Sequence, residues 1–150
     1  MTPPQNTGVG SEGALAPVLS AVMPAYNEGE GIRDVLRAWL RQIDALGVPY
    51  ELRVYDDGSC DGTADVVAAL ARDEPGLVLV WQTNRGHGPT VLRGYREARG
   101  EWIFQTDSDD EMGPESLAAV WAAREQADIV LGYRDDRQSP AGRRLISAVA

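Results

Sequence analysis

The sequence predicts an α/β domain of three layers, with helices on both faces of a mainly parallel β-sheet. Short apolar runs that lack polar alternation, as in strands buried on both faces, alternate along the chain with amphipathic stretches of helical period. This alternation predicts βαβ units joined by right-handed crossovers. Polar and acidic residues directly follow the apolar runs, as expected where parallel strands present a ligand site at one edge of a sheet.

The predicted elements follow one another without an internal repeat. The first strand is a β-rich apolar run that stops at Pro24. A helix begins at Gly31, because its apolar residues recur at i, i+3, i+4 and i+7, and it ends at Gly47, where a C-cap glycine belongs. The second strand leads into an acidic turn, and Ser59 or Asp61 caps the helix that follows.

The second half of the domain continues the same alternation. The third strand leads into the glycine-rich loop 84–89, and the next helix ends at Ala98. The fourth strand starts at Trp102 and runs directly into acidic residues, and Pro114 opens the last helix as a first-turn proline. The predicted strands are 18–23, 50–55, 77–82, the run from 102 and 128–132, and the predicted helices are 31–46, the capped segment ending near 71, 89–98 and 114–126.

The composition limits the range of functions. An apolar fraction of 43% and a charged fraction of 25% are ordinary for a soluble globular domain. A net charge of −9 argues against binding to nucleic-acid phosphates, which depends on basic patches. All 14 basic residues are Arg, and the chain has no Lys. The single cysteine, Cys60, excludes an internal disulfide and fits a reducing, cytoplasmic compartment.

The two ends of the chain differ from the rest. Residues 1–17 are rich in Pro, Gly, Ser and Thr and lack the basic start and apolar run of a signal peptide, so we expect a disordered leader. We expect residues 18–150 to form the domain, and because its last apolar segment, 145–150, stops abruptly, we expect this domain to be incomplete at its C-terminal end. No stretch reaches the length of a transmembrane helix.

Four acids gather just after the fourth strand, namely Asp107, Asp109, Asp110 and Glu111. Carboxylates this close repel one another unless a cation lies among them, and hard oxygen ligands favour Mg²⁺ or Mn²⁺. Such ions usually complete their shell with phosphate oxygens of a bound substrate. A lone Asp-x-Asp is often only a solvated turn, but the buried strand before it and the other strand-end groups favour a metal–diphosphate site.

Four blocks occur in order on these elements: Val22-Met23-Pro24-Ala25-Tyr26-Asn27-Glu28, Val54-Tyr55-Asp56-Asp57-Gly58-Ser59 with Asp61-Gly62-Thr63, Asn84-Arg85-Gly86-His87-Gly88, and Asp107-Ser108-Asp109. Together they resemble the family 2 glycosyltransferases of the Rossmann-like GT-A fold. Segments 128–134 and 143–147 further resemble the polyprenyl-phosphate sugar synthases, a subgroup that includes dolichyl-phosphate-mannose synthases. The resemblance implies inverting transfer of a sugar from a nucleotide-diphosphate donor, with a divalent metal, to a polyprenyl phosphate or glycan acceptor.

The resemblance also implies roles for individual residues. Pro24, Tyr26 and Glu28 would line the nucleotide, and Asp56 or Asp57 would hold its base. The remaining nucleotide-sugar ligands would be Gly86, His87, Asp107, Ser108 and Asp109. The metal would be bound by Asp107, Asp109 and Glu111, and the catalytic residues would be Asp107, Asp109 and Arg134. The acceptor phosphate would be bound by Arg143 and Arg144.

Other functions fit the sequence less well. A haloacid-dehalogenase-type phosphatase also carries Asp-x-Asp after a buried strand, but it expects Thr or Val next and commonly a later Lys, where this chain has Asp110-Glu111 and no Lys. A dinucleotide-binding module needs its glycine fingerprint after the first strand, whereas Gly86-His87-Gly88 follows the third. An EF-hand loop from Asp107 would need Gly and Glu where Met112 and Ala118 stand. A catalytically incomplete nucleotide-sugar-binding fragment stays open.

Several of these groups also have a purely structural interpretation. The acidic turn 56–59 can be turn chemistry with a helix cap, and the loop 84–88 can be a glycine turn with His87 exposed. Trp39 and Trp121 fall on the apolar faces of their helices and are expected in the core. Peripheral contact at the inner face of the cell membrane would depend on the pair 143–144, and two charges are a weak anchor.

Overall fold

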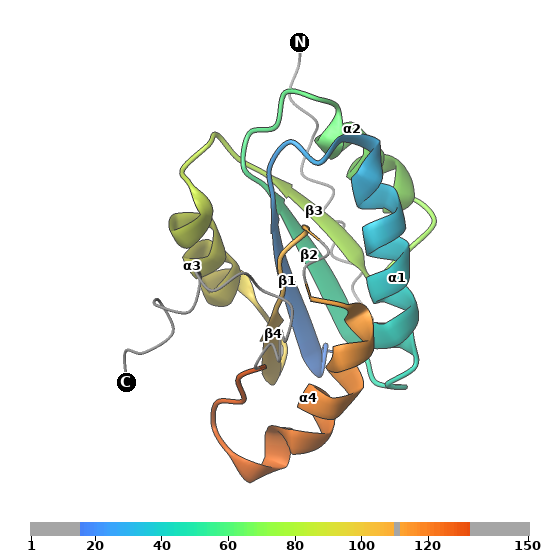
Figure 1. Cartoon of the computed structure of the whole chain (residues 1–150), viewed down its shortest axis with the longest axis vertical. Coiled ribbons are helices and arrows are strands. Elements are labelled where there is room, and N and C mark those ends of the chain that lie inside the picture. Colours follow the sequence, from blue (N-terminus) through green and yellow to red (C-terminus); the bar gives the residue numbers. More distant parts are fainter. Residues whose placement is uncertain (1–15, 110–111, 133–150) are drawn as a thin grey trace, which may run out of the picture.

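The computed structural model describes residues 16–109 and 112–132. Its sheet has four parallel strands in the order β3-β2-β1-β4 (Figure 1). The strands are β1 (Leu19–Ala25), β2 (Tyr50–Asp56), β3 (Leu77–Trp81) and β4 (Trp102–Gln105). The helices are α1 (Ile32–Asp44), α2 (Thr63–Leu70), α3 (His87–Glu97) and α4 (Leu117–Ala123), with 3₁₀ turns at Gly29–Gly31, Pro114–Ser116 and Arg124–Gln126.

Helices cover both faces of the sheet, which confirms the predicted three-layer α/β/α architecture. On one face α1 contacts α2 and α4, and α2 lies against β3. On the other face α3 packs against β1 and β2 (Figure 1). Parallel strands need such crossovers, so the alternation of periods in the sequence was sufficient to predict the layers.

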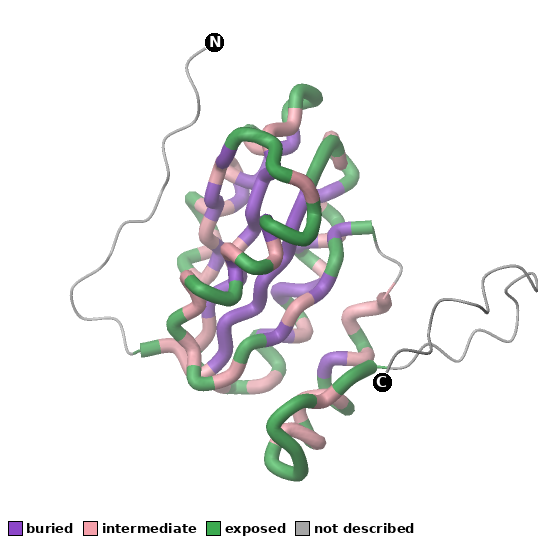
Figure 2. Tube along the Cα trace, turned by 90° about the vertical axis from the view of Figure 1, so that its left-hand side faces the viewer, coloured by how far each residue is buried: buried purple, intermediate pink, exposed green. Residues whose placement is uncertain are grey.

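The main core lies between the sheet and the helices α1, α2 and α4. Trp39 is fully buried there, and its ring centroid is 5.4 Å from that of Phe104 on β4. Trp121 packs against the same core but is only partly buried, with the guanidinium of Arg124 4.1 Å from its ring centroid. Figure 2 shows the central strands buried along most of their length, whereas the segment after 112 is largely exposed or half-buried.

A smaller core lies on the face covered by α3. It is built from Val22, Tyr55 and Val80, one residue from each of three neighbouring strands. α3 comes close to this face because it carries Gly94, where an added Cβ atom would collide with the side chains of Val22 and Tyr55. The glycine therefore sets the distance between α3 and the sheet.

The prediction that Pro24 stops the first strand is wrong, because β1 continues through it to Ala25. The carbonyls of Val18 and Val22 accept hydrogen bonds from the β4 side of the sheet, so the missing N–H of Pro24, two residues further, faces that side as well. β4 has already ended there, since its last pairing joins Gln105 to Val22. No ladder hydrogen bond is lost, and proline is tolerated inside the strand.

The predicted fifth strand, 128–132, is also wrong for the described residues, since this segment has no regular secondary structure. A strand needs a partner, and among the residues described β4 pairs with β1 alone. Ile129 and Leu131 are 75% and 86% exposed, so this short apolar run is not buried as a strand. The predicted helix 114–126 is confirmed in extent, with 3₁₀ turns at both ends. No helix in the described ranges is long and apolar enough to cross a bilayer.

Candidate functional site

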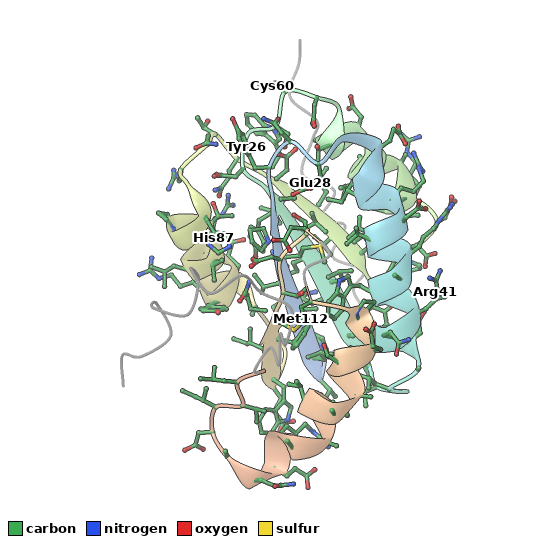
Figure 3. The ribbon with its side chains drawn as sticks, in the orientation of Figure 1. Tyr26, Glu28, Arg41, Cys60, His87 and Met112 are labelled. Atoms are coloured by element: carbon green, nitrogen blue, oxygen red, sulfur yellow. The ribbon has the colours of Figure 1, made fainter. Side chains whose placement is uncertain are left out.

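The loops that follow β1, β2, β3 and β4 meet at the carboxyl edge of the sheet, as predicted. Together they line a cleft of about 290 Å³, to which the loop after β1 contributes Tyr26 and Glu28 and the start of α3 contributes His87 (Figure 3). The lining comprises Pro24, Ala25, Tyr26, Glu28, Asp57, Asn84, Gly86, His87, Thr90, Asp107, Ser108 and Asp109. Among the predicted nucleotide-sugar ligands, only Asp56 is outside this lining.

Asp57 is the most strongly held acid of the cleft. Its Oδ1 accepts hydrogen bonds from Gln82 Nε2 at 2.6 Å and from the Arg85 N–H at 2.8 Å, and its Oδ2 accepts one from the Gly86 N–H at 2.8 Å. Burial alone would raise the pKa of Asp57, but these hydrogen bonds outweigh burial and lower the pKa below its ordinary value. The loop after β3 is thus folded around an ionised carboxylate.

Asp56, the neighbouring acid, is turned into the protein. It is fully buried, its Oδ1 accepts the Ser59 N–H at 2.8 Å, and its Oδ2 has no hydrogen-bond partner among the described residues. The turn interpretation therefore holds for Asp56, whereas Asp57 faces the cleft. The N-cap of α2 is Gly62 and not the predicted Ser59 or Asp61, although Asp61 Oδ1 accepts the N–H of Thr63, the first residue of the helix, at 3.1 Å.

The loop after β1 is tied to the loop after β2 and to the start of α2 by hydrogen bonds from backbone N–H groups to side-chain oxygens. Asn27 has a positive φ of 55°, its N–H donates to Ser59 Oγ, and its side-chain oxygen accepts the Cys60 N–H. The N–H groups of Glu28 and Gly29 both donate to Thr63 Oγ1. This anchoring leaves Tyr26 half exposed at the cleft.

One side-chain hydrogen bond joins the first loop to the acidic loop after β4. Ser108 Oγ donates to Glu28 Oε1 at 2.7 Å, and Ser108 is buried. The two flanking acids, Asp107 and Asp109, remain exposed. The Asp-x-Asp segment is thus pinned at its centre while its carboxylates face outward.

Asp107 has two polar neighbours. Its Oδ1 lies 2.8 Å from His87 Nε2 and accepts a hydrogen bond from Gln105 Nε2 at 2.9 Å. The side chains of His87 and Asp107 are 64% and 48% exposed, so solvent reaches the pair. From the sequence, His87 was either a ligand-binding residue or an exposed loop residue. In the structure it is in hydrogen-bond contact with Asp107, a predicted metal ligand.

Only some of the predicted metal ligands lie among the residues that the structure describes. In 16–109 and 112–132 no group of three or more His, Cys, Asp or Glu side chains could hold a metal ion. Asp107 and Asp109 are both on the cleft, whereas Glu111 lies outside the described residues. Arg134, Arg143 and Arg144 also lie outside them. The roles of these residues stay predictions.

Two residues of the site were missed by sequence reasoning, Gln82 and Thr90. Gln82 Nε2 donates to both Asp57 Oδ1 and Thr90 Oγ1, and Thr90 Oγ1 donates to the carbonyl of Gly86. Both are buried. Gln82 is the polar residue just after an apolar strand, and this position could have indicated a site residue. Thr90 lies inside a helix, where the sequence gave no such indication.

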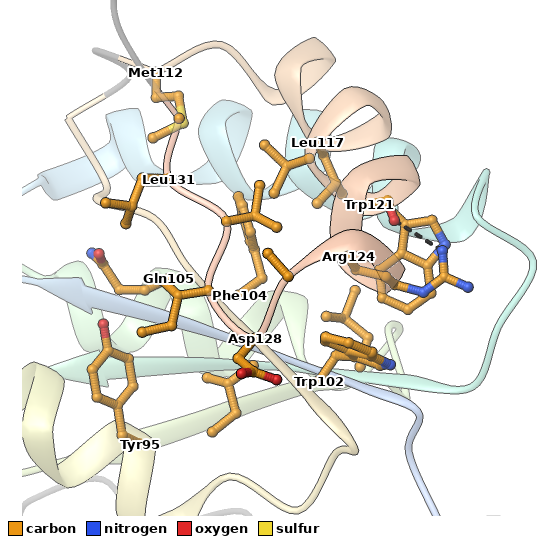
Figure 4. A pocket seen from close by; sticks show the side chains of 17 residues that line it. Tyr95, Trp102, Phe104, Gln105, Met112, Leu117, Trp121, Arg124, Asp128 and Leu131 are labelled. Atoms are coloured by element: carbon orange, nitrogen blue, oxygen red, sulfur yellow. Dashed lines mark hydrogen bonds between the residues drawn. The ribbon is translucent and has the colours of Figure 1, made fainter.

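A larger cavity of about 570 Å³ lies away from this cleft, beside β4 (Figure 4). Its walls are mostly apolar and include Trp102, Phe104, Leu117 and Trp121, and the segment 127–132 closes one side. Its few polar side chains include none of the acids that converge on the cleft. Its one acidic lining residue among those described is Asp128, whereas several acids meet in the smaller cleft, which is therefore the better candidate for chemistry that needs paired carboxylates.

Comparison with known families decides the classification. The sequence profile of "Glycosyl transferase family 2" matches residues 20–146, which is most of the chain. The chain belongs to this family. The matched region contains all four blocks on which the resemblance rested and every predicted site residue.

Curated relatives in this family are identical to the chain at about a third of the aligned positions. It is 30% identical over 132 residues to the undecaprenyl-phosphate 4-deoxy-4-formamido-L-arabinose transferase of Edwardsiella ictaluri, covering 86% of this chain and 41% of the relative. It is 33% identical to the protein of the same name from Shewanella sediminis, covering 86% and 40%. The chain thus spans about two fifths of the length of these relatives. The resemblance to the polyprenyl-phosphate subgroup is confirmed.

Solved structures give the same fold. A mannosyltransferase from Pyrobaculum calidifontis, in complex with GDP-Man and Mn²⁺, matches with a TM-score of 0.51 and 31% identity over 63% of this chain and 28% of its own. S. aureus TarS 1-349, in complex with UDP, matches with a TM-score of 0.54 and 26% identity over 72% of this chain and 32% of its own. The family 2 chain therefore has part of a GT-A glycosyltransferase fold, as predicted.

Proposed function

We propose that the chain forms the donor-binding part of a glycosyltransferase that moves a sugar, with inversion, from a nucleotide diphosphate to a polyprenyl phosphate. The observation that carries the proposal is the meeting of Asp57, Asp107 and Asp109 in one cleft of a family 2 chain. Relatives named for undecaprenyl-phosphate sugar transfer support the acceptor, and neighbours bound to GDP-Man or UDP support the donor.

The nucleotide would lie along the loops after β1 and β2. Tyr26, half exposed beside the cleft, offers an aromatic face to a base or ribose. Asp57 offers a carboxylate whose direction is fixed by three donors, so it can accept a further N–H from a base without reorganising. Asp57 is therefore the better base ligand of the acid pair, because Asp56 is buried behind it.

A divalent metal would be held by the acidic loop. Asp107 and Asp109 supply hard oxygen donors on the cleft, and Mg²⁺ commonly takes only one or two carboxylates, with phosphate oxygens and waters for the rest. The residues present therefore fit Mg²⁺ or Mn²⁺, with Glu111 as a further ligand, and the Mn²⁺ in the Pyrobaculum neighbour supports this choice. Bound there, the ion would neutralise charge on the diphosphate.

The chemistry needs little more than positioning and charge neutralisation. Loss of the diphosphate builds negative charge on the leaving group, and Arg134 would help neutralise it. A phosphate acceptor is already ionised at neutral pH, so it needs no strong base and attacks from the face opposite the leaving group. Arg143 and Arg144 would hold this acceptor phosphate beside the donor, and orientation in the cleft would supply much of the rate.

A second candidate is binding of a nucleotide sugar without turnover. The chain's two-fifths share of its relatives' length supports this candidate, because residues needed for the acceptor can lie in the unmatched part. For the intact protein we further propose a cytoplasmic location with peripheral contact at the inner face of the membrane, where the lipid acceptor would be met. The phosphatase alternative gains no support from the family match.

The test is titration with UDP- and GDP-sugars in the presence and absence of Mn²⁺. We expect metal-dependent binding that Asp109→Ala abolishes, while Asp73→Ala, which removes an exposed acid of the loop before β3, leaves binding unchanged. Transfer to undecaprenyl phosphate separates the two candidates, since binding without transfer supports the binding-only function. Hydrolysis of phosphatase substrates without nucleotide-sugar binding would contradict both.

A further inference from the structure

Gln82 joins the candidate site to a partly buried polar network behind it. The side chain lies between the Asp57 carboxylate and the Arg93 guanidinium, and the residue is only 6% exposed. Its Nε2 is 2.6 Å from Asp57 Oδ1, and its Oε1 accepts a hydrogen bond from Arg93 Nη1 at 2.9 Å. Gln82 is not in the lining of the cleft, so it reaches a ligand only through Asp57 or Thr90.

The chemistry of the neighbours fixes the orientation of the amide. Arg93 can only donate, so it requires the oxygen of Gln82, and an ionised Asp57 can only accept, so it requires the nitrogen. A flipped amide would oppose donor to donor at Arg93 and acceptor to acceptor at Asp57. The Nε2 of Gln82 is therefore held in the position from which it donates to the carboxylate of Asp57.

Arg93 is itself held from behind. Its Nε donates to Glu97 Oε1 at 2.7 Å, one turn further along α3, and its guanidinium carbon lies 5.8 Å from the ring centroid of the buried Tyr55. Tyr55 OH and Arg53 also donate to Glu97. Through Gln82, the network links Asp57 to residues of β2 and α3 that are not in the lining of the cleft.

We infer that Gln82 is a positioning residue for the nucleotide site, which aims the Asp57 carboxylate into the cleft and is itself oriented by Arg93. The inference rests on the proposed function, because it takes Asp57 as a nucleotide ligand. The hydrogen bond between Gln82 and Asp57 is shielded from water, where a polar contact has its largest effect. Three donors on Asp57 leave the carboxylate a single direction.

The experiment compares Gln82→Met and Gln82→Glu with the wild type in titrations with UDP and GDP plus Mn²⁺. Methionine keeps the shape but removes donor and acceptor, whereas glutamate keeps the acceptor for Arg93 and places a second carboxylate against Asp57. We expect both variants to weaken nucleotide binding by about 10- to 100-fold. Circular dichroism checks that each variant is folded, and if the methionine variant unfolds, the glutamate variant decides.

Two further variants separate positioning from packing. Arg93→Met should weaken nucleotide binding in the same direction, while Arg96→Met, which changes an exposed arginine on the same helix, should leave it within about twofold of wild type. In an Asp57→Ala background, where Gln82 has no polar side chain to aim, Gln82→Met should change the affinity by less than about twofold, because its effect passes through Asp57.

The results that overturn the inference are distinct from those that overturn the proposed function. Wild-type protein that binds neither nucleotide contradicts the proposed function. Wild-type protein that binds, with folded Gln82 variants of unchanged affinity, contradicts the positioning role alone. Equal losses in the wild-type and Asp57→Ala backgrounds would also contradict it, because Gln82 would then act independently of Asp57.

Discussion

Replacing Asp57 by Asn is the sharpest perturbation of the candidate site. The carboxylate accepts two hydrogen bonds on Oδ1 and one on Oδ2, all from groups that can only donate. Asparagine keeps one oxygen, so its NH₂ must face a donor. The least harmful arrangement leaves Oδ1 with Gln82 and Arg85 and turns the NH₂ toward the Gly86 N–H, which then loses its acceptor.

The expected cost is about 2 kcal/mol, since one charge-assisted hydrogen bond is lost and one donor is left unsatisfied in a partly buried position. For a domain of this size that corresponds to a fall in Tm of roughly 5 to 10 °C. Thermal unfolding followed by circular dichroism at pH 7 measures the difference. Asp73→Asn, the same change at an exposed site, is the matched control and should shift Tm by less than about 2 °C.

The same variant predicts a pH dependence with a definite sign. The folded-state pKa of Asp57 is lowered, so its contribution to stability is complete above the unfolded pKa of about 3.9 and is lost as pH falls through the folded value. Wild type should therefore exceed Asp57→Asn in stability at pH 7, and the gap should close only below about pH 4. A gap absent at pH 7, or one that grows on acidification, would refute this description of the loop.

Three further predictions concern the scaffold and are read from urea denaturation. Trp39→Ala should cost about 3 to 5 kcal/mol, because the fully buried ring against Phe104 is replaced by a cavity, and Trp39→Phe should cost less. Gly94→Ala should cost about 1 to 3 kcal/mol through collision with the β1 and β2 side chains, whereas Gly88→Ala, with open space around it, should not destabilise. Glu51→Ala should cost about 3 kcal/mol, because it strips a buried acceptor from its arginine partners, and it should leave nucleotide affinity unchanged.

Much of the fold could be predicted because its signals are local. The apolar period of α1 and Pro114 at the start of the last helix are each readable within a few residues, and the structure places both as expected. Gly47 has the expected positive φ but follows the C-cap of α1, Ala45, by two residues. The convergence of the strand-end groups followed from parallel topology alone. Recognising that the loops after four strands share one edge therefore needed no coordinates.

The remaining features depend on distant parts of the chain. Pro24 is tolerated in β1 only because β4 ends earlier. The length of β4 cannot be predicted from the residues of β1. Likewise, the apolar segment 128–132 has the pattern of a strand, yet among the described residues no neighbour pairs with it. The contact between Gln82 and Arg93 joins residues 11 apart through side-chain geometry that no spacing rule predicts.

The most direct test of a single nucleotide–metal site is paramagnetic line broadening by Mn²⁺ in the presence of UDP or GDP. The predicted result is selective loss of the amide signals of residues 26–28, 57, 84–87 and 107–109, which line one cleft or border it. Asp109→Ala should abolish this pattern. Broadening centred on the apolar cavity beside β4, or broadening spread evenly over exposed acids, would contradict a shared site at the carboxyl edge of the sheet.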